Sequence, residues 1–134
     1  MPRTKEAELK ATLETLPLPA YVFDVKAQRF ISVNRLFCDL VGYTEDELKE
    51  LPWHKLLADR AEIAAGHQAI EAPQFNVPII FRGVRKDGTP IAAALKYRAM
   101  TFVRDDGEVV EAFFSVVTSI EGEQPKPATE VFKG

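Results

Sequence analysis

The chain has 134 residues and a formal net charge of −3, and 46% of its residues are hydrophobic. This length and composition are those of one globular domain with a single core, and they suggest neither a disordered chain nor a membrane protein. The acidic balance argues against nucleic-acid binding, and because no run approaches the ~18 apolar residues that span a bilayer, we expect a cytoplasmic segment without membrane contact.

The N-terminal segment, residues 1–16, is predicted to hold a short amphipathic helix. Leu9, Leu13 and Leu16 recur at spacings of four and three, which places them on one stripe of that helix. Pro17 stops the helix. A stripe of this kind needs an apolar partner, so we expect the helix to cover a sheet or to form part of a dimer.

The next segments predict a hairpin followed by two short helices. The apolar runs 20–25 and 29–33 are joined by polar residues, as in a β-hairpin. Asn34 follows at once, where its side chain can cap a helix that Gly42 would end. Thr44 stands three residues before a glutamate, which is the spacing of a capping box and predicts the start of the second helix.

The second half of the chain begins with one longer helix and then changes to a β pattern. Residues 59–72 form an alanine-rich helical segment that a proline ends. Three strands joined by tight Asp-Gly turns are predicted at 79–84, 90–103 and 109–120. The last residues, 122–134, contain prolines, glycines and scattered charges, which are typical of a linker or tail.

This order of elements resembles the PAS family over about residues 16–121, and we take 17–121 as the domain. Three local features carry the resemblance: the Asn34 cap after a strand, the Val-Gly-Tyr-Thr-Glu-Asp-Glu-Leu segment at 41–48, and the Arg-Lys-Asp-Gly-Thr turn at 85–89. The resemblance implies an α+β fold, in which a five-stranded antiparallel sheet carries short helices on one face and an N-terminal amphipathic helix. It also implies a sensory domain that encloses a pocket for a cofactor or small ligand.

Strand alternation gives the candidate pocket residues. Leu95 and Tyr97 share one face of the long strand, and we expect that face to point inward. The candidates from the inward strand faces and the helices are Phe37, Val41, Leu56, Ile63, Ile79, Phe81, Leu95, Tyr97, Phe113 and Ser115. The hydroxyls of Tyr97 and Ser115 can orient the polar end of a small apolar ligand. Alternatively, Tyr97 packs and bonds a backbone carbonyl, and the domain fills the pocket with its own side chains.

The outer face of the last strand carries apolar residues where a solvated sheet would be polar. Phe114 and Val116 lie on that face. The stripe of Leu9, Leu13 and Leu16 is the obvious cover, either folded back within one chain or exchanged between two chains. We expect a homodimer through this helix and the outer face of the sheet.

The resemblance also raises two cofactors. Flavin photosensors of this family carry a reactive cysteine where this chain has Trp53-His54-Lys55, and Cys38 lies in an earlier helix. Haem relatives carry a histidine where this chain has Asp59-Arg60. The cofactor is therefore unknown, and haem and photoreactive flavin are disfavoured. The two histidines and one cysteine do not form a metal-ligand pattern.

The resulting hypothesis is a sensory and dimerisation module of a bacterial signalling protein, acting on an output domain or partner protein. No nucleophile elbow, phosphate loop or zinc motif is present, so we do not expect an enzyme. One alternative is a structural protein–protein interaction domain that binds no ligand. A weaker one is a ketosteroid-isomerase-like enzyme, for which Asp24 and Asp39 are the early acidic candidates.

Overall fold

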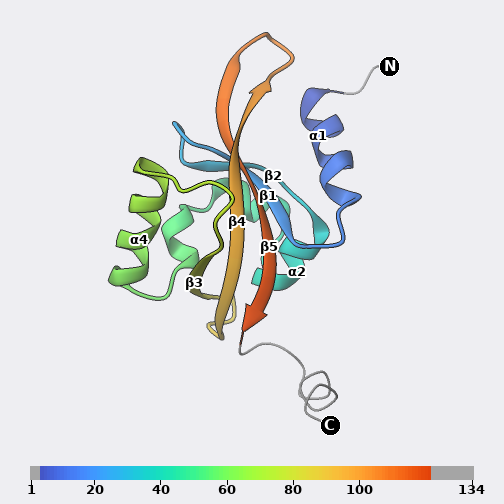
Figure 1. Cartoon of the computed structure of the whole chain (residues 1–134). Helices are drawn as coiled ribbons and strands as arrows, with labels where there is room; N and C mark the ends of the chain where they lie inside the picture. The colour runs from blue at the N-terminus through green and yellow to red at the C-terminus, as the bar shows by residue number, and fades with distance from the viewer. Residues whose placement is uncertain (1–3, 122–134) are drawn as a thin grey trace.

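The computed structural model describes residues 4–121, and at its centre is a five-stranded antiparallel sheet in the order β2-β1-β5-β4-β3 (Figure 1). This architecture confirms the predicted fold class. In chain order the elements are α1 (Lys5–Glu14), β1 (Ala20–Asp24), β2 (Arg29–Val33), α2 (Arg35–Val41), α3 (Glu45–Glu50), the 3₁₀ helix η1 (Trp53–Leu56), α4 (Arg60–Glu71), β3 (Ile79–Val84), β4 (Pro90–Val103) and β5 (Val109–Glu121). No helix among the described residues has the length and apolar character needed to cross a membrane.

The two faces of the sheet bury separate apolar clusters. On the inner face, Phe23, Tyr97, Phe113 and Val117 of the strands pack with residues of α2 and α3, and η1 and α4 lie at the margin of this cluster. On the outer face, a second cluster joins the stripe of α1 to β1, β2, β4 and β5. Strand alternation produces both clusters, because successive side chains of one strand point to opposite faces.

Helix boundaries follow the capping residues of the sequence. The Thr44 hydroxyl accepts from the Glu47 backbone N–H while the Glu47 carboxylate accepts from that of Thr44, which completes the predicted capping box. Gly42 ends α2 with a φ of 83°, in the left-handed region that favours glycine. The Asp59 carboxylate accepts from the Glu62 N–H and begins α4.

Asn34 is fully buried and does more than cap a helix. Its Oδ1 accepts from the backbone N–H groups of Phe37 and Ala20, each at 3.0 Å. Its Nδ2 donates to the carbonyl oxygens of Leu13, at 3.1 Å, and Leu18, at 2.8 Å. This one side chain therefore joins the end of α1, the segment after it, the start of β1 and the start of α2.

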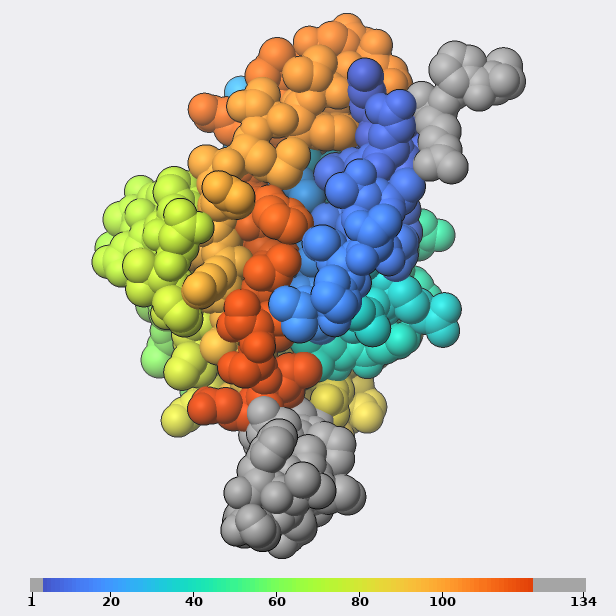
Figure 2. Space-filling view, turned by 45° about the vertical axis from the view of Figure 1, so that its right-hand side comes forward, coloured from blue at the N-terminus to red at the C-terminus, as the bar shows by residue number. Residues whose placement is uncertain are grey.

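Helix α1 folds back onto the outer face of the sheet of its own chain (Figure 2). Leu13 is 1% exposed, and Leu9 and Leu16 are partly buried in the same cluster as Phe114 and Val116. Polar contacts fix the ends of the helix: the Lys5 N–H donates to the Asp105 carboxylate and Glu14 accepts from the Arg35 N–H. Of the two covers considered for this face, the one within a single chain is present, and residues 122–134, the predicted tail, lie outside the described residues.

Candidate functional site

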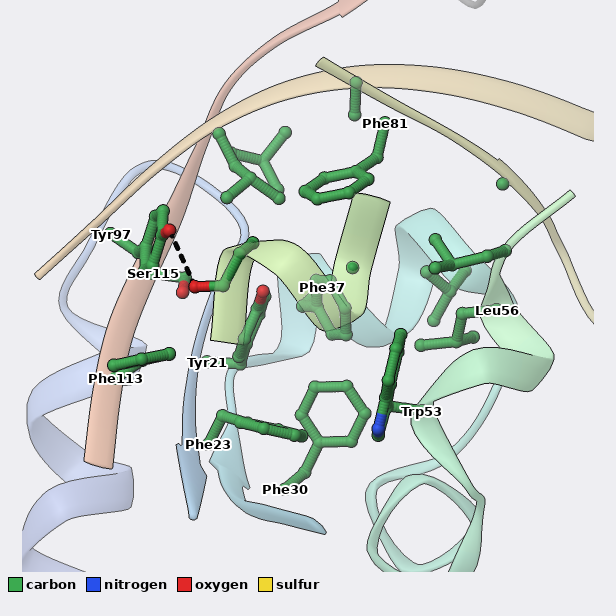
Figure 3. A pocket seen from close by; sticks show the side chains of 18 of the residues that line it. Tyr21, Phe23, Phe30, Phe37, Trp53, Leu56, Phe81, Tyr97, Phe113 and Ser115 are labelled. Atoms are coloured by element: carbon green, nitrogen blue, oxygen red, sulfur yellow. Dashed lines mark hydrogen bonds between the residues drawn. The ribbon is translucent and has the colours of Figure 1, made fainter. Parts of the chain in front are cut away.

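A cavity of about 160 Å³ lies between the inner face of the sheet and the helices (Figure 3). Eight of the ten predicted pocket residues line it, and they come from α2, η1 and the inward faces of β3, β4 and β5: Phe37, Val41, Leu56, Phe81, Leu95, Tyr97, Phe113 and Ser115. The inward side of β4 and β5 was assigned from alternation alone. This assignment of the inward-facing residues is correct because the β-bulge of the β4–β5 pair lies at Ala94/Leu95, beyond the pairing of Tyr97 with Ser115.

Ile63 and Ile79 do not line the cavity, which corrects two of the predicted positions. The cavity reaches α4 only at its last two turns, through Gly66, Ala69 and Ile70, and Ile63 lies one turn earlier. Ile79 is the first residue of β3 and packs at the margin of the inner cluster instead. Both side chains are half-buried outside the cavity.

The strongest feature that the sequence analysis missed is the aromatic wall from the first hairpin and η1. Tyr21, Phe23, Phe30 and Trp53 all line the cavity. Alternation along β1 could have placed Tyr21 and Phe23 on one face, but no inward face was assigned to that strand. The Trp53 ring lies directly against α4, because a Cβ added to Gly66 would be 2.5 Å from Trp53 Cζ3.

The Tyr97 hydroxyl is occupied by the protein itself. It donates to the carbonyl oxygen of Ala69 at 3.0 Å, the dashed line in Figure 3, and accepts from the Gln74 N–H at 3.1 Å. The ring of Phe75 packs edge-on against those of Tyr97 and Phe113, with centroids 5.4 and 5.6 Å away. Tyr97 therefore links the end of α4 and the segment after it to β4. This is the alternative in which Tyr97 packs and bonds a backbone carbonyl.

Tyr21 and Ser115 form a second pair of hydroxyl groups in the cavity wall. They are register partners on β1 and β5, and both line the cavity. Burial raises the pKa of the Tyr21 phenol, and a hydrogen bond with Ser115 acts in the opposite direction. The phenol is therefore neutral at physiological pH and can both donate and accept.

The titratable side chains singled out from the sequence lie elsewhere. Cys38 is half-buried, burial raises the pKa of its thiol, and it is not among the residues that line the cavity. His54 and His67 are exposed, and the His67 ring packs edge-on against Trp53 with centroids 5.0 Å apart. Within residues 4–121, no group of three or more His, Cys, Asp or Glu side chains is arranged to hold a metal ion.

Solved structures similar to the chain include several light-oxygen-voltage (LOV) domains. A Rhodobacter sphaeroides LOV protein has a TM-score of 0.69 and 16% identity, covering 90% of this chain and 68% of its own. The LOV domain of a blue-light activated histidine kinase from Erythrobacter litoralis has a TM-score of 0.62 and 18% identity, covering 81% and 99%. A third structure, described as a flavin analogue in a LOV domain, has a TM-score of 0.63 and 18% identity, covering 94% and 91%. Comparison with curated proteins gives no match.

These structures contradict the expectation that a photoreactive flavin is disfavoured. That expectation rested on one short segment, Trp53-His54-Lys55, which stands where a reactive cysteine was sought. The fold shared over most of the chain is that of LOV domains. The expectation was wrong because a reactive cysteine forms only one covalent bond in the photochemistry. Noncovalent binding of a ring system depends instead on the whole cavity wall.

The comparison with protein families gives the assignment. The PAS domain matches residues 19–121, which is more than half of the chain and includes every strand and every helix except α1. The three local features from which the resemblance was drawn all lie within this range. The chain therefore belongs to the PAS domain family.

Proposed function

We propose that this PAS domain is a sensory module that responds to a small, largely apolar molecule in its cavity and acts by binding rather than by catalysis. The observation that carries the proposal is the lining of the cavity. Of the described residues that line it, none is Asp, Glu, His, Lys or Arg, and eight are aromatic: Tyr21, Phe23, Phe30, Phe37, Trp53, Phe81, Tyr97 and Phe113. An aromatic wall of this kind favours a flat apolar ligand.

The connection of the cavity wall to α1 supports a sensory role. Phe37 lines the cavity, and its backbone N–H is held by the Asn34 side chain, which also holds the Leu13 carbonyl of α1. A ligand that moved α2 would therefore strain a bond to the helix that covers the outer face. We propose that occupancy reaches an output domain or partner protein by this path.

We also propose a homodimer through α1 and the outer face of the sheet. The support is that Leu9, Leu16, Phe114 and Val116 are only partly buried in the outer cluster, so its margin stays open to a second chain. Size-exclusion chromatography with light scattering tests this proposal. A dimer that Phe114→Ser converts to a folded monomer supports the proposal. A chain that stays monomeric at every concentration up to about 1 mM, where even contacts of weak affinity would form, contradicts it.

Native mass spectrometry with an absorbance scan tests the sensory proposal. A mass above 15.0 kDa per chain identifies a bound molecule directly, and a visible band identifies a chromophore. Flavin belongs among the candidates, and its absorbance would reveal it. Bare protein that gains no thermal stability from any member of a panel of flat apolar compounds would instead favour the structural interaction domain.

A further inference from the structure

We infer that the Tyr21 and Ser115 hydroxyls are the polar recognition pair of the cavity, and that its ligand is an uncharged ring compound with a hydrogen-bonding group at one end. This inference rests on the proposed function, because it specifies what the cavity binds. It replaces the sequence-based assignment of the polar role to Tyr97 and Ser115.

The strand register brings three hydroxyl residues into one row. Tyr21 of β1 pairs with Ser115 of β5, and Ser115 pairs in turn with Tyr97 of β4. Because directly paired residues point to the same face of a sheet, all three side chains project to the cavity side. In Figure 3 the hydroxyl end of Tyr21 points into the cavity, and Ser115 lies in the wall beside Tyr97.

Two of the polar groups in the wall are already used by the protein. Tyr97 donates to the Ala69 carbonyl and accepts from the Gln74 N–H. The Trp53 indole N–H donates to the Gln28 side chain at 3.0 Å. Among the described residues that line the cavity, the side chains left to meet a polar ligand atom are those of Tyr21 and Ser115.

The chemistry of two neighbouring hydroxyls sets what they recognise. Each hydroxyl offers one donor and two acceptor lone pairs. Together the two hydroxyls hold two O–H donors and four lone pairs, so a ligand can meet both a donor and an acceptor. A ligand carbonyl or hydroxyl satisfies this pair, whereas a carboxylate would enter a wall without a countercharge and lose its hydration.

The cavity size sets the scale of the probe. Its volume of about 160 Å³ is close to that of an engineered apolar cavity of about 150 Å³ that binds benzene. Single-ring compounds therefore fit. Toluene, 4-methylphenol and 4-methylbenzoate form a matched set that differs at one end: apolar, neutral hydroxyl and anion.

The test is a titration of the folded protein with these three compounds, followed through the ¹H–¹⁵N NMR spectrum. We expect toluene and 4-methylphenol to bind saturably, and 4-methylbenzoate to bind at least tenfold more weakly at pH 7. Tyr21→Phe and Ser115→Ala should each weaken 4-methylphenol about fivefold, the value of one net hydrogen bond, and change toluene binding less than twofold. Tyr97→Phe is the matched control, and it should leave the 4-methylphenol-to-toluene ratio unchanged.

Distinct results overturn the inference and the proposal beneath it. The inference is wrong if toluene binds but Tyr21→Phe and Ser115→Ala affect both compounds equally, if Tyr97→Phe changes the ratio as they do, or if 4-methylbenzoate binds as well as 4-methylphenol. If toluene gives no saturable shifts with the wild-type chain, the cavity does not take apolar rings, and the proposed function fails as well. The comparison of the three probes on the wild-type chain needs no variant, so it tests whether the ligand must be uncharged even where a variant does not fold.

Discussion

Replacing Asn34 with alanine should destabilise the domain far more than the loss of an ordinary helix cap. The side chain is fully buried and makes four hydrogen bonds to backbone groups of four different segments. At about 1 kcal/mol net for each bond, Asn34→Ala should lower the free energy of unfolding by about 4 kcal/mol. That is a large share of the roughly 5–15 kcal/mol by which a typical domain is stable.

Urea unfolding measures this loss directly. With a slope of about 2 kcal/mol per molar urea, the midpoint should fall by about 2 M. Asp59→Ala is the matched control, because Asp59 caps α4 through one exposed bond to Glu62 and its removal should cost about 1 kcal/mol. If Asn34→Ala costs no more than Asp59→Ala, the four bonds do not act as a junction and the proposed path from α2 to α1 loses its support.

Three further substitutions test individual features of the structure. Gly66→Ala should lower the melting temperature and shift the fluorescence of Trp53, the only tryptophan, because the added methyl group would meet the indole ring at 2.5 Å. A rise in melting temperature would contradict this, because it would show that alanine stabilises the helix more than the contact with the ring destabilises the domain. Gly42→Ala should cost about 1 kcal/mol in denaturant unfolding, since φ is 83° there, and an unchanged midpoint would contradict the left-handed cap. Burial alone would raise the pKa of Glu14, but hydrogen bonds from Lys10 and a backbone N–H bring it below its ordinary value. Its stabilising effect is therefore present near neutral pH and is lost as pH falls below the ordinary glutamate pKa of 4.5. Glu14→Gln should flatten melting temperature against pH in that acid range, and an unaltered acid limb would refute this.

The fold could be predicted because short sequence features mark the ends of its helices and the turns between its strands. The Asn34 cap, the Gly42 terminus and the Thr44 capping box fix where helices begin and end, and each depends on a single side chain or on its absence. The two Asp-Gly turns fix the register of the long strands, because Gly88 and Gly107 both have a φ of 89°. Alternation then places Tyr97 and Ser115 on the cavity face.

The site could be predicted only in part, because its decisive contacts are non-local. The bonds that occupy the Tyr97 hydroxyl come from the end of α4 and the segment after it, 28 and 23 residues away respectively. The pairing of Tyr21 with Ser115 joins the first strand to the last, and neither strand alone indicates it. Ile63 could not be excluded either, since it lies three and seven residues before Gly66 and Ile70, which do line the cavity, and only the tertiary structure shows where the cavity ends.

The central claim, that the cavity takes a small apolar molecule, is tested most directly by comparing toluene binding to the wild-type chain and to Ala93→Leu. Ala93 lines the cavity from β4, so the larger side chain should fill space that a ligand needs. We expect saturable NMR shifts at the amides of cavity-lining residues of the wild-type domain, and at least tenfold weaker binding to a folded Ala93→Leu variant. Equal toluene affinity for both proteins, or shifts confined to residues away from the cavity, would contradict the claim.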